Sequence, residues 1–281
     1  MTTFHSSKFP VLIVGGTGKT GRRVAKRLAA LGLPVRIGSR QGTPAFDWEN
    51  PDTWAVALEG VSAGYITYYP DLAVPGAADA VGELARLAVR KGVKRLVLLS
   101  GRGEPEAQRA EQALQASGAD WTIVRASWFA ENFSESFFRE PILAGDFALP
   151  VQGVREPFIH ADDIADIVVA ALTNTRHIGE LYEVTGPRLI TFAEATAEIA
   201  KATRRDIHFT PIPHDVFMQG LAADGVPDDV AALIDELFRS VLDGRNEYLT
   251  DGVQRALGRA PRDFADFAQA GAAAGVWEQA K

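Results

Sequence analysis

A glycine-rich turn near the start of the chain has residue types and a spacing that suit phosphate binding. In segment 11–21, VLIVGGTGKTG, the residues Gly16, Gly18 and Gly21 form the pattern GxGxxG between an apolar run and a helical pattern. Such glycines permit a tight turn, let backbone N–H groups approach a pyrophosphate, and pack the helix against the strand. The partial positive charge at the helix N-terminus attracts the same phosphates. The motif therefore predicts a dinucleotide site, the alternative being a merely tight strand–helix turn.

The same residues include Gly18-Lys19-Thr20, which is similar to the end of the phosphate loop of nucleoside triphosphatases. That loop, GxxxxGK[ST], requires a glycine where this chain has Ile13. Gly21 is also unexpected in such a loop. The spacing therefore disfavours a triphosphatase.

The segment about twenty residues further on indicates which dinucleotide binds. An NAD site usually has Asp or Glu here, whose carboxylate accepts hydrogen bonds from the ribose 2′-OH. Segment 35–40, VRIGSR, contains no carboxylate, and Arg40 with Ser39 is suited to a 2′-phosphate. We therefore expect NADP(H), the alternative role of Arg40 being that of a solvated surface residue. Asp47 and Trp48 end a further expected strand and could contact the adenine, or Trp48 could serve packing alone.

The usual acid of short-chain dehydrogenases is missing. Those enzymes use a Tyr with a Lys four residues later, and none of the five tyrosines here has such a lysine. The absence of cysteine excludes disulfides, thiolate zinc sites, iron–sulfur clusters and thiol nucleophiles. The five histidines show no HxxxH spacing, which disfavours a zinc hydrolase. The reactivity is therefore expected to come from the cofactor.

The elements that must position these residues alternate between strands and helices up to about residue 187. Apolar runs without alternation, such as VLIVG and RLVLLS, indicate strands buried on both faces of a sheet. The alternation predicts an α/β fold, a Rossmann-type doubly wound parallel sheet with helices on both faces. The expected strands are 10–14, 34–39, 45–48, 64–68, 95–100, 120–125 and 180–185, and the clearest helices are 20–31, 76–91 and 106–117.

The remainder of the chain has a different pattern. Thr191 and Glu194 have the spacing of a capping box at the start of a helix over 191–202. A second helix is expected over 228–242, and segment 252–277 is Ala-rich and helical in period. We therefore expect an NAD(P)-binding domain over residues 1–187 and a small, mainly helical C-terminal lobe over residues 188–281.

The charge and hydropathy of the chain indicate which classes of partner it binds and in which cellular compartment it is expected. The net charge of −7 and the pI of about 5.3 argue against a nucleic-acid partner. No apolar run approaches the roughly 20 residues that span a bilayer, and the first ten residues contain no signal core. We therefore expect a cytoplasmic protein with no membrane partner. The bias to 22 arginines over 7 lysines, with abundant alanine, indicates a bacterial source.

Six segments, spread in order over nearly the whole chain, carry a family resemblance: GGTGKTG, VRIGSR, VKRLVLLS, WTIVRASWFAENF, REPFIHADDIADIV and YEVTGPRLITFAEA. Together they resemble the NmrA-like family of atypical short-chain dehydrogenases/reductases. Within it the chain is most similar to NAD(P)H-dependent reductases of the festuclavine/agroclavine dehydrogenase group, and more distantly to triphenylmethane and quinone reductases. The resemblance implies a Rossmann-type domain, a small C-terminal lobe, and a substrate cleft between them.

The resemblance also implies roles for individual residues. The 2′-phosphate would lie at Arg40, and Tyr69-Pro70, Ser100 and the turn Ala126–Phe129 would line the path to the nicotinamide. The phosphate-binding residues would be Gly15, Thr17, Gly18, Lys19 and Thr20.

Two positions depart from the family pattern. A lysine of many relatives is replaced by Ala107, so that acid is also missing. His160 stands where relatives often have Asp; its imidazole titrates near neutral pH, so it could transfer a proton or could be structural. Tyr69 and His160 are therefore the candidate proton donors.

The segment 128–138, which begins within the motif WTIVRASWFAENF, is rich in aromatic residues. Phe129, Phe133 and Phe137 recur every four residues and would share one face of a helix, as core or as pocket. The resemblance favours Trp128 and Phe129 as apolar walls for a flat substrate. Candidates for the opposite wall are Phe217 and Met218.

These observations predict an NADPH-dependent reductase that delivers hydride directly to a small, apolar or aromatic acceptor. An iminium ion, a quinone or another conjugated acceptor needs little help from a protein acid at the hydride step, which fits the missing Tyr-x-x-x-Lys and Lys. The alternative is a non-catalytic NADP-binding redox sensor of the NmrA type, which the missing acid fits equally well.

Overall fold

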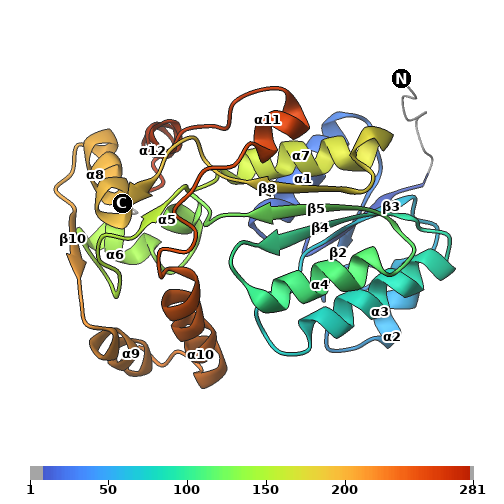
Figure 1. Ribbon diagram of the computed structural model, residues 1–281, viewed down its shortest axis with the longest axis horizontal. Coiled ribbons are helices and arrows are strands. Elements are labelled where there is room, and N and C mark those ends of the chain that lie inside the picture. The colour runs from blue at the N-terminus through green and yellow to red at the C-terminus, as the bar shows by residue number, and fades with distance from the viewer. Residues whose placement is uncertain (1–8, 279–281) are drawn as a thin grey trace. The chain divides into compact units, whose positions relative to one another are not determined.

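A parallel sheet of six strands organises the first part of the chain (Figure 1). The computed structural model describes residues 9–278. The strand order is β2-β1-β3-β4-β5-β8, and the order reverses between β1 and β3, the position where open α/β sheets bind ligands. This sheet confirms the predicted Rossmann-type fold. The strands are β1 (Val11–Val14), β2 (Val35–Gly38), β3 (Ala63–Ile66), β4 (Arg95–Gly101), β5 (Asp120–Ala126) and β8 (Glu180–Val184).

Helices cover both faces of this sheet, as Figure 1 shows. Leu12 and Val14 pack into an apolar core with α2, α3 and α4. Because side chains alternate along a strand, Ile13 and its neighbour Tyr65 face the other side, where the Tyr65 hydroxyl meets Thr20 of α1. The helices of this part are α1 (Lys19–Ala30), α2 (Asp52–Ala57), α3 (Ala77–Arg90), α4 (Pro105–Gln115), α7 (Ala161–Thr173) and α11 (Gly252–Leu257), with a short 3₁₀ helix at Thr175–His177.

One predicted strand, 45–48, is wrong. Its backbone is satisfied locally: the Asp47 N–H donates to the Thr53 hydroxyl (3.0 Å), and the Asp47 carbonyl accepts from the Trp54 indole (2.7 Å). Only an isolated bridge between Asp47 and Asn50 has strand character. Because these backbone groups are already hydrogen-bonded, the segment cannot pair with a neighbouring strand and extend the sheet.

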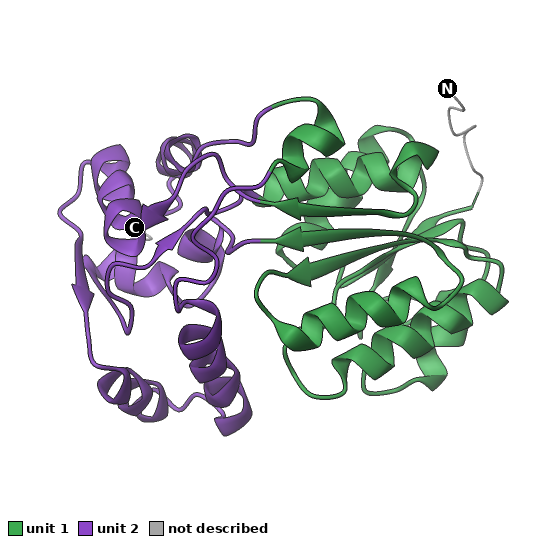
Figure 2. Ribbon diagram, in the orientation of Figure 1, with its two compact units in different colours: residues 1–126, 161–184, 251–259 green, residues 127–160, 185–250, 260–281 purple. Residues whose placement is uncertain are grey.

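The chain divides into two compact units, coloured separately in Figure 2. Unit 1 contains the sheet and consists of residues 1–126, 161–184 and 251–259, while unit 2 consists of 127–160, 185–250 and 260–281. The expected division at residue 187 does not describe these units. The chain leaves unit 1 after β5, returns for α7 and β8, and returns again for α11, so each unit is built from separate segments.

Unit 2 combines helices with two pairs of short strands. The lobe expected over residues 188–281 was mainly helical, so these strands were not predicted. Strands β6 (Asp146–Leu149) and β10 (His208–Pro211) pair in parallel, and β7 (Arg155–Glu156) and β9 (Ile190–Thr191) pair antiparallel. An aromatic core surrounds Phe133. The helices are α5 (Asn132–Glu135), α6 (Arg139–Ala144), α8 (Phe192–Thr203), α9 (His214–Ala223), α10 (Asp228–Glu236) and α12 (Phe264–Ala273).

Helix ends in the C-terminal part of the chain confirm one prediction and refine two others. The Thr191 hydroxyl accepts from the Glu194 N–H (3.1 Å), and the Glu194 carboxylate accepts from the Thr191 N–H (2.7 Å), the predicted capping box. The helix predicted over 228–242 changes to a π-helix at Leu237–Val241. The segment 252–277 forms two helices, α11 and α12, because Gly258 adopts a left-handed conformation (φ 72°) after α11. Within residues 9–278, no helix has both the length and the apolar character that crossing a membrane requires.

Candidate functional site

The β1–α1 turn has the geometry that the glycine motif predicts. The Gly15 N–H donates to the Gly38 carbonyl at the end of β2 (2.9 Å), and the Gly18 N–H donates to the Gly15 carbonyl (2.9 Å). Gly15 has φ 72°, and a Cβ built on it would lie 2.1 Å from the Thr67 hydroxyl. The turn therefore requires glycine here for both conformation and space.

The third glycine of the motif packs α1 on the turn. A Cβ on Gly21 would lie 2.2 Å from the Gly15 carbonyl oxygen and 2.8 Å from the Gly16 Cα, both backbone atoms. A Cβ on Gly16 would meet the Ile37 side chain at 2.9 Å. These contacts are the close helix–strand approach that the motif predicts.

The N-terminus of α1 is exposed and, within the described residues, has no side-chain cap, so its first N–H groups point toward a site suited to an anion. Gly18 is the N-cap, no side chain caps the helix, and no acidic residue lies in its first turn. Thr17 and Gly18 are exposed and Lys19 is partly exposed. N–H groups, helix dipole and a cation therefore coincide at one exposed turn, which suits a phosphate.

Thr20, the last predicted residue of this turn, is buried. Its hydroxyl accepts a hydrogen bond from the Tyr65 hydroxyl (2.9 Å). Burial raises the pKa of Tyr65, which keeps the phenol a neutral donor. The Thr20 hydroxyl therefore connects α1 to β3.

Ser39 and Arg40 follow β2, whose last residue is hydrogen-bonded to the glycine turn. The Ser39 carbonyl accepts from the Gly42 and Phe46 N–H groups (2.9 Å each), which closes the loop. Arg40 is exposed, and in the described part of the chain its guanidinium has no ion-pair partner. An exposed cation beside this turn can bind an additional phosphate.

Asp47 and Trp48 are engaged in local structure. The Asp47 carboxylate accepts from the Glu49 N–H (3.2 Å). The Trp48 indole donates to the Thr67 carbonyl (3.1 Å), and its ring packs on those of Phe46, Trp54 and Tyr68. These contacts favour a packing role for the Trp48 side chain. A contact between Asp47 or Trp48 and the adenine of the cofactor stays a prediction.

The remaining predicted cofactor residues lie at or beyond the carboxyl ends of strands. Tyr69-Pro70 follows β3, and Tyr69 is 72% exposed. Ser100, near the end of β4, is buried and donates to the Glu111 carboxylate (2.6 Å). Ala126 ends β5, and its carbonyl accepts from the Arg102 N–H (3.0 Å). The Ser100 hydroxyl therefore has a carboxylate partner that sequence reasoning missed.

A network of ion pairs supports this edge of unit 1. Arg125 lies between Glu111 (2.5 Å) and Glu183 (3.3 Å), and Arg102 pairs with Glu183 (2.9 Å). The hydrogen bonds that Arg125 donates to Glu111 raise the pKa of Arg125. The spacing of these residues along the sequence gives no sign of the network, because its members come from the loop after β4 and from α4, β5 and β8.

Unit 2 brings three of the four predicted wall residues into one aromatic cluster. The Phe238 ring lies 5.5 Å from Trp128 and 5.2 Å from Phe217, centre to centre, and Met218 packs against the same core. Phe238 comes from the π-helix and was not predicted as a wall residue. Its position in the helix expected over 228–242 indicates only that its side chain lies on a buried face. Phe129 is partly buried and forms a β-bridge with Ile159.

The aromatic stripe predicted over Phe129, Phe133 and Phe137 is wrong. Phe133 is fully buried in the core, whereas Phe137 is 48% exposed in a turn. Only Asn132–Glu135 is helical in this region, so the three rings share no helix face.

His160, a candidate proton donor, is paired with a buried carboxylate. Its Nδ1 lies 2.8 Å from Glu131, which is 1% exposed, and its ring contacts Phe267 edge-on. The backbone bonds between 128–130 and 159 position the pair. Both residues belong to unit 2, while Tyr69 belongs to unit 1.

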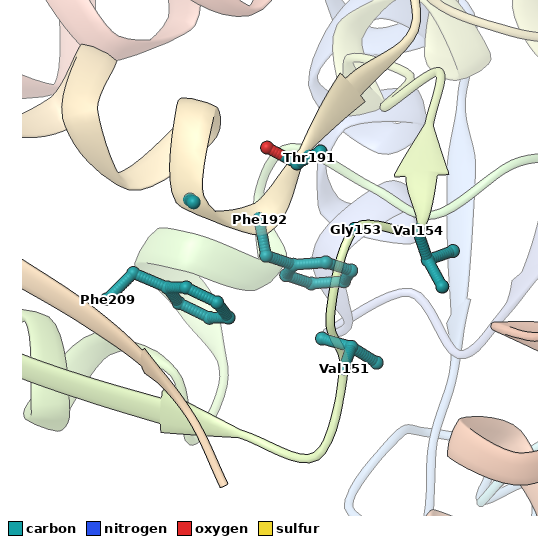
Figure 3. A pocket seen from close by; sticks show the side chains of 7 residues that line it. Val151, Gly153, Val154, Thr191, Phe192 and Phe209 are labelled. Carbon is teal, nitrogen blue, oxygen red and sulfur yellow. The ribbon is translucent and has the colours of Figure 1, made fainter.

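An apolar pocket in unit 2 lies away from the predicted walls. It has a volume of about 200 Å³, and Figure 3 shows Val151, Val154, Phe192 and Phe209 around it. Ligand pockets commonly reach roughly 300–1,000 Å³. Since none of the predicted wall residues lines it, this pocket does not locate the acceptor.

Comparison with known proteins identifies relatives across nearly the full length. The NAD(P)H-binding family matches residues 15–175. The uncharacterized oxidoreductase YesF of Bacillus subtilis is 33% identical, over 94% of this chain and 96% of its own. The NAD(P)H azoreductase of Xenophilus azovorans is 30% identical, over 94% and 98%. The agroclavine dehydrogenase of Claviceps fusiformis is 30% identical, over 92% and 95%.

Solved structures share the fold at lower sequence identity. The quinone oxidoreductase QOR2 of Escherichia coli, in complex with NADPH, gives a TM-score of 0.74 at 20% identity, covering 92% of this chain and 99% of that one. The triphenylmethane reductase of Citrobacter sp., in complex with NADP(H), gives 0.73 at 18% identity, covering 94% and 100%. The transcriptional regulator NmrA gives 0.68 at 15% identity, covering 93% and 95%.

The glycine turn, the parallel sheet and these relatives agree. The chain belongs to the NAD(P)H-binding, NmrA-like family and is an NAD(P)H-dependent oxidoreductase.

Proposed function

We propose that this enzyme uses NADPH and delivers hydride directly to a small iminium, quinone or other conjugated acceptor. The observation that carries the proposal is the exposed, uncapped N-terminus of α1, with the exposed Arg40 on the loop after β2. The pyrophosphate would bind the first and the 2′-phosphate the second. A guanidinium binds a phosphate through charge-assisted hydrogen bonds. Arg40 should therefore favour NADPH, which carries the 2′-phosphate, over NADH, which does not.

The type of acceptor follows from the acid that is missing and from the aromatic cluster. Hydride addition to an iminium carbon yields a neutral amine and needs no proton, so no Tyr-x-x-x-Lys is required. We infer that Trp128, Phe217 and Phe238 supply an apolar surface for a flat acceptor. Relatives named as an azoreductase and an agroclavine dehydrogenase support conjugated substrates of this kind.

A turnover panel tests the proposal. Purified protein is mixed with NADPH or NADH and with a quinone, a cyclic iminium ion or an azo dye, and cofactor oxidation is followed by absorbance. We expect oxidation with at least one acceptor and a lower KM for NADPH than for NADH. If NADPH binds yet is oxidised no faster than in buffer across the panel, the protein is a sensor of NADP rather than a reductase.

A further inference from the structure

Two acidic side chains that neither bind the cofactor nor pair with a cation in the proposed function lie in unit 1, in loops that follow adjacent strands. Asp71 comes directly after Tyr69-Pro70 in the loop after β3, and Glu104 lies between β4 and α4. Because β3 and β4 are neighbouring parallel strands, these loops emerge at the same edge of the sheet. This is the edge at which open α/β sheets bind their ligands.

The position of Glu104 is defined by Gly101, the last residue of β4. A Cβ built on Gly101 would lie 2.1 Å from one carboxylate oxygen of Glu104 and 2.2 Å from the other. The carboxyl group therefore lies directly against the backbone beside Ser100. Its Oε2 atom is buried and accepts no hydrogen bond from an N–H or hydroxyl group of residues 9–278.

The Asp71 carboxyl group lies next to that of Glu104, close enough that each affects the pKa of the other. Its other contacts are with backbone N–H groups, including that of Ala73 (2.9 Å). Within residues 9–278, neither carboxyl group has a Lys, Arg or His partner. Two carboxylates can share a hydrogen bond only if one of them carries a proton.

The surrounding charges do not remove the need for this proton. Glu111 also faces Glu104, but Glu111 is paired with Arg125 and accepts from Ser100. Burial is the main factor that raises the pKa of both Asp71 and Glu104, and the negative charges of Asp71 and Glu111 raise that of Glu104 further. Desolvation and like charge act in the same direction here.

We propose that Asp71 and Glu104 share one proton at neutral pH and that this pair donates it to acceptors whose reduction requires a proton. The inference rests on the proposed function and extends it, since it supplies the acid that Tyr-x-x-x-Lys provides in other reductases. It also widens the range of acceptors from iminium ions, which need no proton, to quinones and azo compounds, which do.

The reaction balances with the cofactor as reductant. For a quinone, bound NADPH would supply one hydride, with its two electrons, to one carbonyl oxygen, and the ring electrons of the quinone would move to the opposite carbonyl oxygen. That opposite oxygen would take the proton of the Asp71–Glu104 pair and form an O–H bond. One hydride and one proton complete the two O–H groups, the pair regains its proton from solvent, and the products are hydroquinone and NADP⁺.

Infrared spectroscopy and two acceptors test the two parts of the proposal. The spectra of the wild type, Glu104→Gln and Glu106→Gln are recorded at pH 7, where a protonated carboxyl group gives a C=O band separate from carboxylate bands. Glu106, two residues after Glu104, is the matched control because among the described residues its ion-pair partner is Arg109, on the surface of α4. We expect the band in the wild type and in Glu106→Gln, and its loss in Glu104→Gln.

The kinetic part compares a quinone with an N-methyl cyclic iminium ion. We expect Glu104→Gln to lower kcat for the quinone about 100-fold, the scale of general acid catalysis, and to leave the iminium rate within about twofold. Asp71→Asn, which breaks the pair from the other side, should give the same split. In the wild type the quinone rate should fall at alkaline pH, and this dependence should disappear in both variants.

Equal losses with both acceptors would show a structural role and overturn the proposal. An unchanged quinone rate, or no band in the wild type, would overturn it as well. A wild type that oxidises NADPH with neither acceptor would refute the proposed function and the donation step together, while the infrared band would still decide whether the pair holds a proton.

Discussion

The replacement Gly21→Ala tests whether the glycine turn is as closely packed as the structure indicates. The new Cβ would lie 2.2 Å from the Gly15 carbonyl oxygen, about 1 Å inside the ordinary carbon–oxygen contact of roughly 3.3 Å. Both contacting groups are backbone, so no side-chain rotation relieves the clash, and α1 must move away from the turn.

The cost of that movement follows from two terms. Overpacking of this kind destabilises by about 1–3 kcal/mol, which exceeds the roughly 1 kcal/mol that alanine gains over glycine in a helix. Displacing one N–H from a bound phosphate removes a hydrogen bond to a charged group, about 1.5–3 kcal/mol. We therefore expect the Kd for NADPH to rise by at least about tenfold.

The assay combines urea unfolding with calorimetric titration of NADPH, and Gly220→Ala is the control. Gly220 also lies in a helix, but a Cβ there meets nothing within 4 Å, so the same substitution should stabilise the protein slightly and leave the Kd unchanged. If Gly21→Ala behaves like Gly220→Ala in both measurements, the close approach of α1 to the turn is not what the cofactor requires.

Three further substitutions test other parts of the account. Arg40→Ala should raise the Kd for NADPH at least about tenfold, through loss of a charge-assisted hydrogen bond, and leave that for NADH unchanged; equal losses for both, by titration, would refute the 2′-phosphate role. Trp128→Leu should raise the KM for flat aromatic acceptors several-fold without changing the Kd for NADPH, and an unchanged KM would place the acceptor elsewhere. Burial and the Arg176 guanidinium lower the pKa of His177 to about 4, and Arg176 donates to its Nε2 (3.1 Å), so the folded state keeps this imidazole neutral. The unfolded chain binds the proton near pH 6.5; stability should therefore be complete above that pH and decline as the pH falls toward 4, by about 2 kcal/mol between pH 7 and pH 5. Urea unfolding should show this decline in the wild type and not in His177→Gln, and an equal decline in both would contradict the assignment.

Local sequence signals predicted the features that depend on neighbouring residues. The GxGxxG spacing identified the turn at Gly15–Gly21 because its glycines serve contacts within a few residues. The capping box at Thr191 and Glu194 was equally local. The strand predicted over 45–48 failed because Thr53 and Trp54, from the following helix, satisfy the backbone of Asp47.

Features assembled from distant segments could not be predicted in this way. Asp71 and Glu104 lie in different loops, and only the pairing of β3 with β4 brings these loops to one edge. The pairing of His160 with Glu131 depends likewise on backbone bonds between residues 128–130 and 159. The chain passes between the two compact units five times, so no single position in the sequence marks their boundary.

Direct hydride transfer is the central claim, and isotope labelling tests it most directly. NADPH carrying deuterium at the transferred position of C4 is mixed with enzyme and a cyclic iminium acceptor in ordinary water, and the amine is analysed by mass spectrometry. We expect one deuterium on the former iminium carbon and a slower rate than with unlabelled NADPH. An amine without deuterium, or labelled NADPH that stays bound and unoxidised, would contradict it.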